Sequence, residues 1–218
     1  MKHGLASGAE LTPQRPDWTV DQGWDNYTAQ EHAVWKTLFE RQTQLLPGLA
    51  CDAFVEGMKN LPITVDCIPD FVQLSQALQP ATGWQVVAVS GLVPDEVFFE
   101  HLANRRFPAG NFIRRAHQLD YLEEPDVFHD VFGHVPMLMH PVMADFIQAY
   151  GEAGLRAQRL GKLTELARVC TGTRWSLVWS ASQRACVSMA RALHRRIRKV
   201  FFRCRANRPT ASVSIWSV

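Results

Sequence analysis

Residues 124–136 read Glu-Pro-Asp-Val-Phe-His-Asp-Val-Phe-Gly-His-Val-Pro, and this stretch decides how the rest of the chain is interpreted. It sets two imidazoles, His129 and His134, five residues apart among acidic side chains. Imidazole is a good ligand for iron, zinc, copper and nickel. Five residues of regular helix turn the chain by about 500°, which leaves the two rings roughly 140° apart. We therefore expect Gly133 to end or loosen the helix so that His134 swings back toward His129, with Pro136 blocking a regular continuation.

Taken alone, a His-x4-His pair is more typical of one capping and one core histidine than of a metal site. The whole string Pro-Asp-x-x-His-Asp-x-x-Gly-His-x-Pro, however, resembles the iron-binding signature of the pterin-dependent aromatic amino acid hydroxylases. The resemblance runs from about Trp24 to Arg168 and includes residues 35–48, which look like the opening helix of the single-domain form. It implies a mainly α catalytic domain with a few short β-strands, incomplete at its C-terminus.

The same resemblance implies an enzyme that hydroxylates L-phenylalanine to L-tyrosine with O2, a tetrahydropterin co-substrate and non-haem Fe(II). His129 and His134 would be two of three iron ligands, and no catalytic residue is expected beyond the metal site. Glu124 and Asp126 would orient His129 from outside the metal's own ligands. The choice among phenylalanine, tyrosine and tryptophan stays open in the residues themselves, and single-domain length favours phenylalanine by resemblance.

Two further groups of residues match family positions. The pterin would lie against Gly91, Val93 and Phe98, with Asp130 standing where the family has a glutamate beside the cofactor. Arg114 matches the arginine that pairs with the substrate carboxylate, which suits a guanidinium fork. The neighbouring Arg115 leaves that choice ambiguous in the sequence.

The chain departs from the family at the third iron ligand, a glutamate expected about forty residues after His134. Residues 169–178 read Val-Cys-Thr-Gly-Thr-Arg-Trp-Ser-Leu-Val, and no Asp or Glu follows Glu165. Two imidazoles without a carboxylate should hold Fe(II) weakly. Asp126 or Asp130 are candidates for a substitute, but we expect Asp130 to point elsewhere because it directly follows His129.

The genetic code suggests how the carboxylate was lost. Trp175 is encoded by TGG alone, so with Ser176 as AGT or AGC the codon straddling the two reads GAG, which is glutamate. The shifted frame around it admits Leu-Tyr-Trp-Tyr-Thr-Val-Glu-Phe-Gly-Leu, the family segment that carries the ligand. We infer that the reading frame slips near Arg168, and we expect residues 169–218 to be an out-of-frame, poorly structured basic tail, apart from a helix near Arg184–Cys204.

Charge divides the chain at the same point. Residues 1–168 carry 13 Lys and Arg against 21 Asp and Glu, a balance of −8, whereas residues 169–218 carry ten basic residues and no acid, a balance of +10. A nucleic-acid-binding module with a basic tail is an alternative, because phosphate contacts require charge alone, but we expect no specific nucleic-acid partner. Further alternatives are an inactive remnant without turnover and a zinc hydrolase, which the absence of His-Glu-x-x-His disfavours.

The composition is that of a folded protein: 218 residues, 47% hydrophobic and 20% charged. Five cysteines without a Cys-x-x-Cys spacing predict reduced thiols in a cytoplasmic protein, and we expect no membrane partner and a monomer. We divide the chain into an N-terminal arm (1–27), a partial catalytic domain (28–168) and the tail. Hydrophobic periodicity and capping residues predict helices near 28–47, 50–61, 70–78, 94–102 and 141–160, and strands at 84–89 and 111–114.

Overall fold

A computed structural model describes residues 15–47, 50–120 and 124–163, and the account below concerns these residues. The predicted tail, its helix near Arg184–Cys204 and residues 1–14 of the predicted arm lie outside them. The helices and strands follow in this order: η1 (Trp24–Asn26), α1 (Ala29–Leu45), α2 (Asp52–Asn60), α3 (Phe71–Thr82), β1 (Gln85–Val89), α4 (Asp95–Ala103), β2 (Arg106–Gly110), η2 (Ala116–Gln118), η3 (Phe128–Phe132), η4 (Val135–Met139) and α5 (Pro141–Arg159). The expected fold class, mainly α with a few short strands, is confirmed.

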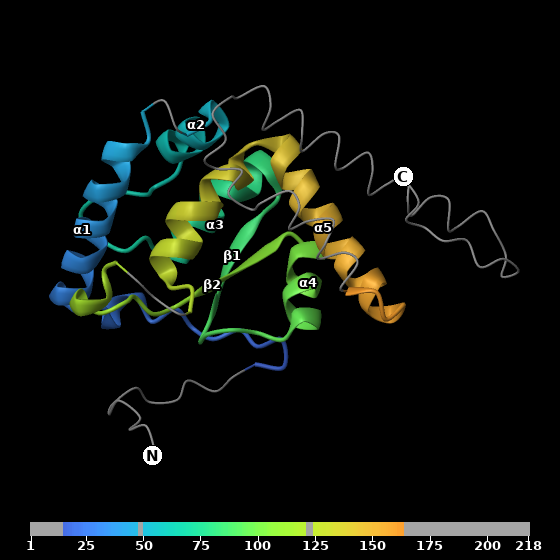
Figure 1. The fold of residues 1–218 in the computed structure, drawn as a ribbon. Helices are drawn as coiled ribbons and strands as arrows, with labels where there is room; N and C mark the ends of the chain where they lie inside the picture. The colour runs from blue at the N-terminus through green and yellow to red at the C-terminus, as the bar shows by residue number, and fades with distance from the viewer. Residues whose placement is uncertain (1–14, 48–49, 121–123, 164–218) are drawn as a thin grey trace, which may run out of the picture.

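The two strands form a parallel pair with α4 as the crossover between them. Gln85 pairs with Arg106 and Val89 with Gly110, so the strands run in step over five residues. Figure 1 shows β1 and β2 in the middle of the molecule, with α1 to one side and α4 and α5 to the other. The carboxyl ends of both strands therefore meet at one edge, and Gly110 at that edge reaches the segment with the two histidines.

The capping chemistry of the first helix is as predicted. Thr28 accepts a hydrogen bond from the backbone of Glu31, and the Glu31 carboxylate accepts one from the backbone of Thr28. This reciprocal pair satisfies two backbone donors that the start of a helix leaves without intrahelical partners. The helix then buries Val34, Trp35 and Leu38 on one face, at the spacing read from the sequence.

One predicted strand is wrong. Residues 111–114 follow the strand instead of forming it, and β2 is Arg106–Gly110. Its sequence, Arg-Phe-Pro-Ala-Gly, contains two residues that are depleted in strands, so propensity alone does not reveal it. Proline is tolerated because β2 lies at the edge of a two-stranded sheet, and the end of α4 delivers the chain directly alongside β1.

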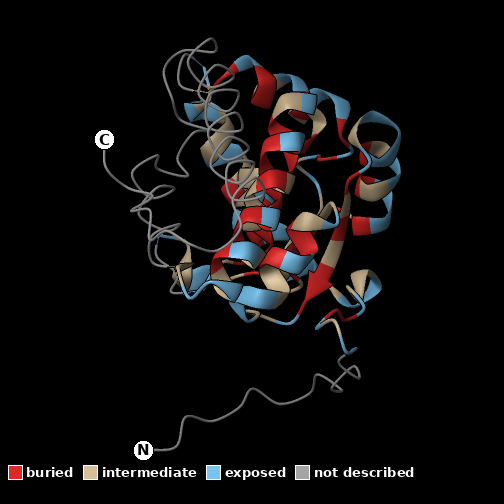
Figure 2. Ribbon diagram, turned by 90° about the vertical axis from the view of Figure 1, so that its right-hand side faces the viewer, coloured by how far each residue is buried: buried red, intermediate tan, exposed pale blue. Residues whose placement is uncertain are grey.

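The buried side chains form one hydrophobic cluster between the helices and the strands. Figure 2 shows the buried positions gathered on the inward faces of the helices and along the strands. Trp35, Phe54 and Trp84 are the largest of these side chains and are fully buried. This cluster packs behind η3 and η4, so the segment with the histidines is fixed from the side opposite its polar groups.

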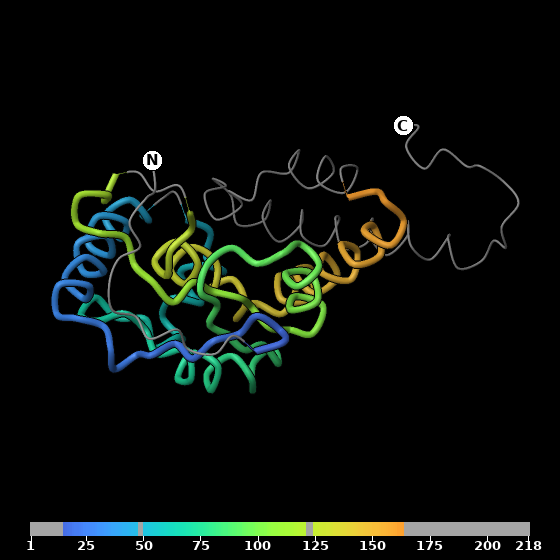
Figure 3. Tube along the Cα trace, turned by 90° about the horizontal axis from the view of Figure 1, so that it is seen from below, coloured from blue at the N-terminus to red at the C-terminus, as the bar shows by residue number. Residues whose placement is uncertain are grey.

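The described part of the predicted arm lies against the strands. Val20 donates its backbone N–H to the Ala88 carbonyl, and Thr19 forms an antiparallel bridge with Val89. Figure 3 follows this blue segment from α1 back along the body toward the green region of α4. At its tip, the His101 ring lies 2.9 Å from the Asp17 carbonyl and Arg106 pairs with the Asp17 carboxylate. The segment is thus anchored by side chains from both α4 and β2.

None of the described helices is both long enough and apolar enough to cross a membrane.

Candidate metal and substrate site

The two histidines of the quoted stretch come together in the structure. Their ring centroids are 5.0 Å apart and the ring planes meet at 68°. The local backbone explains how: residues Phe128–Phe132 form a π-helix, whose hydrogen bonds join each residue to the fifth one along. Five residues of this wider helix make little more than one turn, so positions five apart return to one face. The convergence is as predicted.

The predicted cause of that convergence is wrong. Gly133 lies in the ordinary right-handed helical region, with φ −77° and ψ −30°, which other residues adopt freely. A side chain at this position would meet no atom of the described chain within 4 Å. Gly133 therefore does not bring His134 back; the widened turn before it does. Pro136 lies in the first turn of the short 3₁₀ helix η4, which replaces a regular continuation as expected.

Asp130 holds the ring of His129. Its Oδ1 lies 3.0 Å from His129 Nδ1, and its Oδ2 accepts a hydrogen bond of 2.9 Å from the backbone N–H of Gly110. The hydrogen bond to Asp130 raises the pKa of His129, against the opposing effect of burial. With Nδ1 engaged, Nε2 is the nitrogen of His129 that is oriented for a metal. The Asp130 carboxylate contacts Nδ1 of His129 and the Gly110 N–H rather than Nε2, which agrees with the expectation that Asp130 does not supply the third metal ligand.

His134 is electrostatically different from His129. Burial, together with the neighbouring His129, lowers the pKa of His134 to about 4. Its ring centroid lies 6.0 Å from that of Phe107 on β2. A neutral imidazole at ordinary pH is the form that binds a metal, so this environment favours a ligand role.

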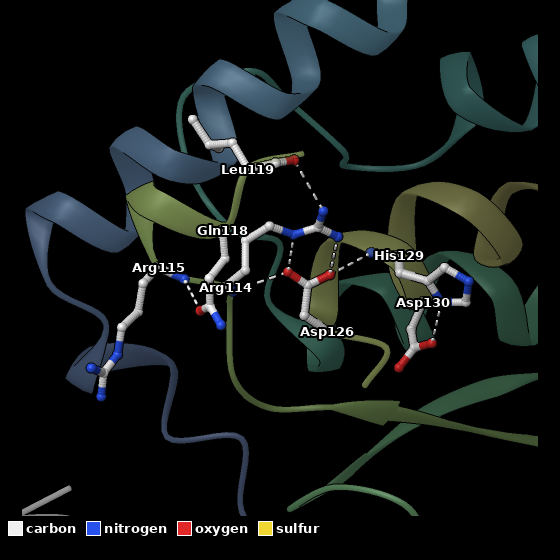
Figure 4. Close-up of polar contacts among 7 residues, drawn as sticks. All are labelled: Arg114, Arg115, Gln118, Leu119, Asp126, His129 and Asp130. Atoms are coloured by element: carbon white, nitrogen blue, oxygen red, sulfur yellow. Dashed lines mark hydrogen bonds and ion pairs between the residues drawn. The ribbon is translucent and has the colours of Figure 1, made fainter. Parts of the chain in front are cut away.

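Asp126 connects the predicted substrate arginine to the predicted metal ligand (Figure 4). It is fully buried and accepts hydrogen bonds from Nε and Nη2 of Arg114 at 2.8 and 2.9 Å. It also accepts the backbone N–H groups of Arg114 and His129, each at 3.0 Å. Burial alone would raise the pKa of Asp126, but the hydrogen bonds from Arg114 and His129 outweigh it and lower that pKa. Asp126 thus fixes the start of the histidine segment through the backbone N–H of His129 rather than through the His129 ring.

The geometry separates the two adjacent arginines. Arg114 points at Asp126 and is mostly buried, whereas the side chain of Arg115 is directed away from the carboxylate (Figure 4). Three of the five N–H groups of Arg114 have partners, the third being the Leu119 carbonyl at 3.4 Å. Arg114 is therefore the arginine that belongs to the cluster around His129.

Of the residues predicted for the pterin, Gly91 and Val93 lie on the loop after β1 and Phe98 on α4, whereas Asp130 lies on η3. A side chain added at Gly91 would come within 3.9 Å of a Glu124 carboxylate oxygen, so this loop lies beside the start of the histidine segment. Phe98 is half-buried and packs edge-on against Phe99, with the ring centroids 5.9 Å apart. Val93 is half-buried, and Leu92 beside it is 68% exposed.

The part of the chain that the structure describes contains no group of three or more His, Cys, Asp or Glu side chains arranged to hold a metal ion. The two imidazoles fit a transition metal, but both carboxylates beside them have other partners. The described residues therefore do not fit the two-histidine, one-carboxylate iron site in full. Glu165 and all residues after it lie outside the description.

Two contacts of the site were missed in the sequence. The Gly110 N–H that anchors Asp130 depends on where β2 ends, and no local pattern reveals it. The Tyr27 hydroxyl donates to the Asn111 carbonyl at 2.8 Å, and burial raises the pKa of Tyr27 to about 12. The contact between His129 and Asp130 did have a signal in the sequence, namely the His-Asp dipeptide itself, because a carboxylate is a common partner for the ring of a metal-binding histidine.

Comparison with known proteins agrees with this geometry. The family described as "Biopterin-dependent aromatic amino acid hydroxylase" matches residues 24–171. "Phenylalanine-4-hydroxylase" of Caulobacter vibrioides is 64% identical over 166 residues, which cover 76% of this chain and 56% of the relative. The chain thus spans little more than half the length of this relative.

Two solved structures of phenylalanine hydroxylase from Chromobacterium violaceum are also similar. The form described as bound to iron and phenylalanine has a TM-score of 0.68 and 52% identity, covering 73% of this chain and 57% of its own. The form with iron(III) and oxidised 7,8-dihydrobiopterin has a TM-score of 0.67 and 57% identity, covering 70% and 56%.

Proposed function

Because this chain belongs to the biopterin-dependent aromatic amino acid hydroxylases, we propose that it derives from a phenylalanine 4-monooxygenase whose metal site it carries in part. The proposed reaction is the conversion of L-phenylalanine to L-tyrosine with O2, a tetrahydropterin and non-haem Fe(II). The observation that supports it most directly is the convergence of His129 and His134, 5.0 Å apart. The relatives named for phenylalanine hydroxylation support the choice of substrate.

The proposed roles follow from position. His129 and His134 bind the metal, and Asp130 and Asp126 hold His129 by its ring and by its backbone. Gly91, Val93 and Phe98 lie on the loop and helix proposed to bind the pterin, and a Cβ added at Gly91 would come within 3.9 Å of the Glu124 carboxylate, so that loop lies beside the metal segment.

Arg114 is proposed to bind the substrate carboxylate. Asp126 fixes its orientation, and acceptors within the described ranges (15–47, 50–120 and 124–163) occupy three of its five N–H groups. A guanidinium held in this way loses little conformational freedom when a carboxylate binds, which favours affinity.

We further propose that the third ligand was lost by a slip of the reading frame near Arg168, which leaves this chain impaired or inactive. The family match ends at residue 171, close to the inferred slip. The Caulobacter relative is 64% identical over 166 residues but is matched over only 56% of its own length. The acid-free composition after Glu165 is then a consequence of the shifted codons rather than a selected basic surface.

Sequencing the gene across codons 165–218, followed by an assay of two proteins, tests this proposal. We expect the DNA to encode Tyr-Thr-Val-Glu-Phe-Gly in the alternate frame. The chain as given should form no tyrosine from phenylalanine with tetrahydropterin and added iron, whereas the protein from the restored frame should form it.

Three outcomes would contradict the proposal in different ways. DNA without the hidden segment rules out the frame slip. Robust tyrosine formation by the chain as given means that another donor completes the metal site. A restored-frame protein that binds iron and pterin but hydroxylates tyrosine or tryptophan instead rules out phenylalanine as the substrate.

A further inference from the structure

Residues 110–114, which we call the connecting segment, lie beside the histidine segment and are joined to it by three hydrogen bonds. The bonds are those from the Gly110 N–H to Asp130 Oδ2 at 2.9 Å, from the Val127 N–H to the Phe112 carbonyl at 2.9 Å, and from the Arg114 N–H to Asp126 Oδ2 at 3.0 Å. The position of the connecting segment therefore affects how Asp130 is held against His129.

Asn111 is fixed through both of its backbone polar groups. Its N–H donates to the Val89 carbonyl at the end of β1 at 3.0 Å, and its carbonyl accepts the Tyr27 hydroxyl at 2.8 Å. Tyr27 lies between η1 and α1, 84 residues earlier in the chain. Burial raises the pKa of Tyr27 to about 12, so the hydroxyl keeps its proton and stays a donor at ordinary pH.

The residue before Asn111 carries the contact to Asp130. Gly110 is buried, and a Cβ added there would lie 3.4 Å from the Pro125 carbonyl oxygen and 3.7 Å from Asp130 Oδ2. The backbone at Gly110 is thus close-packed against the segment with the histidines. A shift of this backbone changes the hydrogen bond to Asp130, whose other oxygen lies 3.0 Å from His129 Nδ1.

The other end of the connecting segment has an anchor of its own. Asp126 accepts the backbone N–H of Arg114 and two N–H groups of its guanidinium. Because these three bonds do not involve Tyr27, Arg114 should stay in place when the Tyr27 hydroxyl is removed. The contacts therefore separate what Tyr27 holds from what Asp126 holds.

We propose that Tyr27 is a positioning residue, which sets the orientation of the His129 ring through the backbone of the connecting segment. Its hydroxyl fixes the carbonyl of Asn111. The neighbouring Gly110 N–H then keeps the Asp130 carboxylate in place against the His129 ring. This inference rests on the proposed role of His129 and goes beyond it, because it gives a residue that precedes α1 a part in the site.

Tyr27→Phe tests the hydrogen bond alone, since it removes the hydroxyl and keeps the ring. The full chain is labelled with 15N and freed of metal, and amide hydrogen exchange is followed by NMR. We expect the Gly110 N–H to exchange about fivefold faster in the variant, the factor that corresponds to loss of one ordinary hydrogen bond. Its proton signal should move upfield as the bond to Asp130 lengthens.

The ring of His129 gives a second reading of the same change. At a pH high enough for the ring to be neutral, the hydrogen bond to Asp130 favours the tautomer with its proton on Nδ1. Two-bond 1H–15N spectra of the histidine rings measure this tautomer, and its share should fall in Tyr27→Phe. The Nε–H signal of Arg114 should not change, because Asp126 holds it.

Trp24→Phe is the matched control. Trp24 Nε1 donates to the Ile68 carbonyl at 2.7 Å, so this variant also removes a bond from an aromatic side chain before α1 to a distant backbone carbonyl. Its acceptor lies between α2 and α3 and not on the connecting segment. Urea unfolding compares the stabilities of both variants. Trp24→Phe should leave the Gly110 exchange, relative to global unfolding, and the His129 tautomer as in the parent.

Three results would overturn the inference. The first is a Tyr27→Phe protein whose Gly110 exchange and His129 tautomer equal those of the parent. The second is the same pair of changes in Trp24→Phe, which would reduce the effect to a general loss of stability. The third is an Arg114 Nε–H signal that changes as much as that of Gly110. All three leave the metal role of His129 untouched, because the measurements involve no metal.

Discussion

At the scale of single residues, Asp126 has the largest share of polar contacts around the site. It is fully buried, and its two oxygens accept the side-chain fork of Arg114 and two backbone N–H groups. A buried ion pair adds little net stability, but removal of one partner leaves the other charge without compensation. The pair therefore matters most as a constraint that ties Arg114 to the start of the histidine segment.

This constraint predicts that Asp126→Asn lowers the stability of the protein substantially. We expect the free energy of unfolding to fall by about 3 kcal/mol, the lower end of the range for breaking a buried pair. The matched control is Asp120→Asn, whose carboxylate is 94% exposed and pairs with Arg41, and which should leave the unfolding midpoint unchanged. Urea unfolding of the parent protein and the two variants at pH 7 measures their free energies of unfolding. Equal midpoints for the two variants would mean that the Asp126 contacts are dispensable.

At the scale of helices and strands, the π-helix Phe128–Phe132 determines the site. A regular helix would separate the two rings by roughly 140°. The wider turn costs some backbone stability, and the stacked rings of Phe128 and Phe132, with centroids 4.9 Å apart, support it from the core side. The functional face is therefore produced by an irregular element that the apolar side of the same segment stabilises.

Close approach of α4 and α5 is a second feature at this scale. Gly154 of α5 faces the ring of Phe99 on α4, and a Cβ built at Gly154 would overlap that ring. Phe99 is buried beside Tyr150, with ring centroids 5.4 Å apart, so it has little room to move.

We therefore expect Gly154→Ala to destabilise the protein, although alanine favours a helix by about 0.5–1 kcal/mol. Overpacking should cost about 1–3 kcal/mol and outweigh that gain. The control is Gly133→Ala, at a helical backbone position where the added carbon would meet no other part of the described chain within 4 Å. It should leave the stability unchanged or raise it by up to about 1 kcal/mol. Thermal unfolding of both variants measures this, and a stable Gly154→Ala protein would show that α4 and α5 separate easily.

At the scale of the whole molecule, His101 joins the N-terminal segment to the body. Its ring is 3% exposed and lies 2.9 Å from the Asp17 carbonyl. Burial lowers the pKa of His101, and the Arg106 charge acts in the same direction, while Asp17 and Glu100 oppose it. Protonation of this ring would place a charge in a buried contact between segments 84 residues apart in the sequence.

This burial gives a pH dependence of definite sign. The unfolded chain takes up a proton near pH 6.5, above the folded pKa of His101. The stabilising contribution is therefore present above about pH 6.5 and is lost as the pH falls through the folded pKa. In His101→Gln, which keeps a donor without the titration, the loss of stability between pH 7 and pH 5 should be smaller. Urea unfolding of the metal-free proteins measures it, with His117→Gln as the exposed control; identical pH profiles for His101→Gln and the parent would contradict the assignment.

Local signals in the sequence were sufficient to predict the elements that depend on contacts between nearby residues. The Thr28–Glu31 capping box, the amphipathic spacing of α5 and the Val-rich run of β1 each depend on neighbouring residues. They were predicted because capping and periodicity act over one or two turns. By contrast, β2 carries Pro108 and Gly110 and forms because β1 and α4 place it in register. The pairing of β2 with β1 produces no pattern within the β2 sequence itself, so it could not be predicted locally.

The sequence alone determined the two imidazoles, their family signature, the missing acid after Glu165 and the charge boundary, since these are properties of residue order. The tertiary structure decided how the rings meet, which of two adjacent arginines faces Asp126, and that Asp130 turns onto His129. Spacing predicts angles on a regular helix, whereas a π-turn and a fully buried carboxylate arise from packing between segments far apart in the chain.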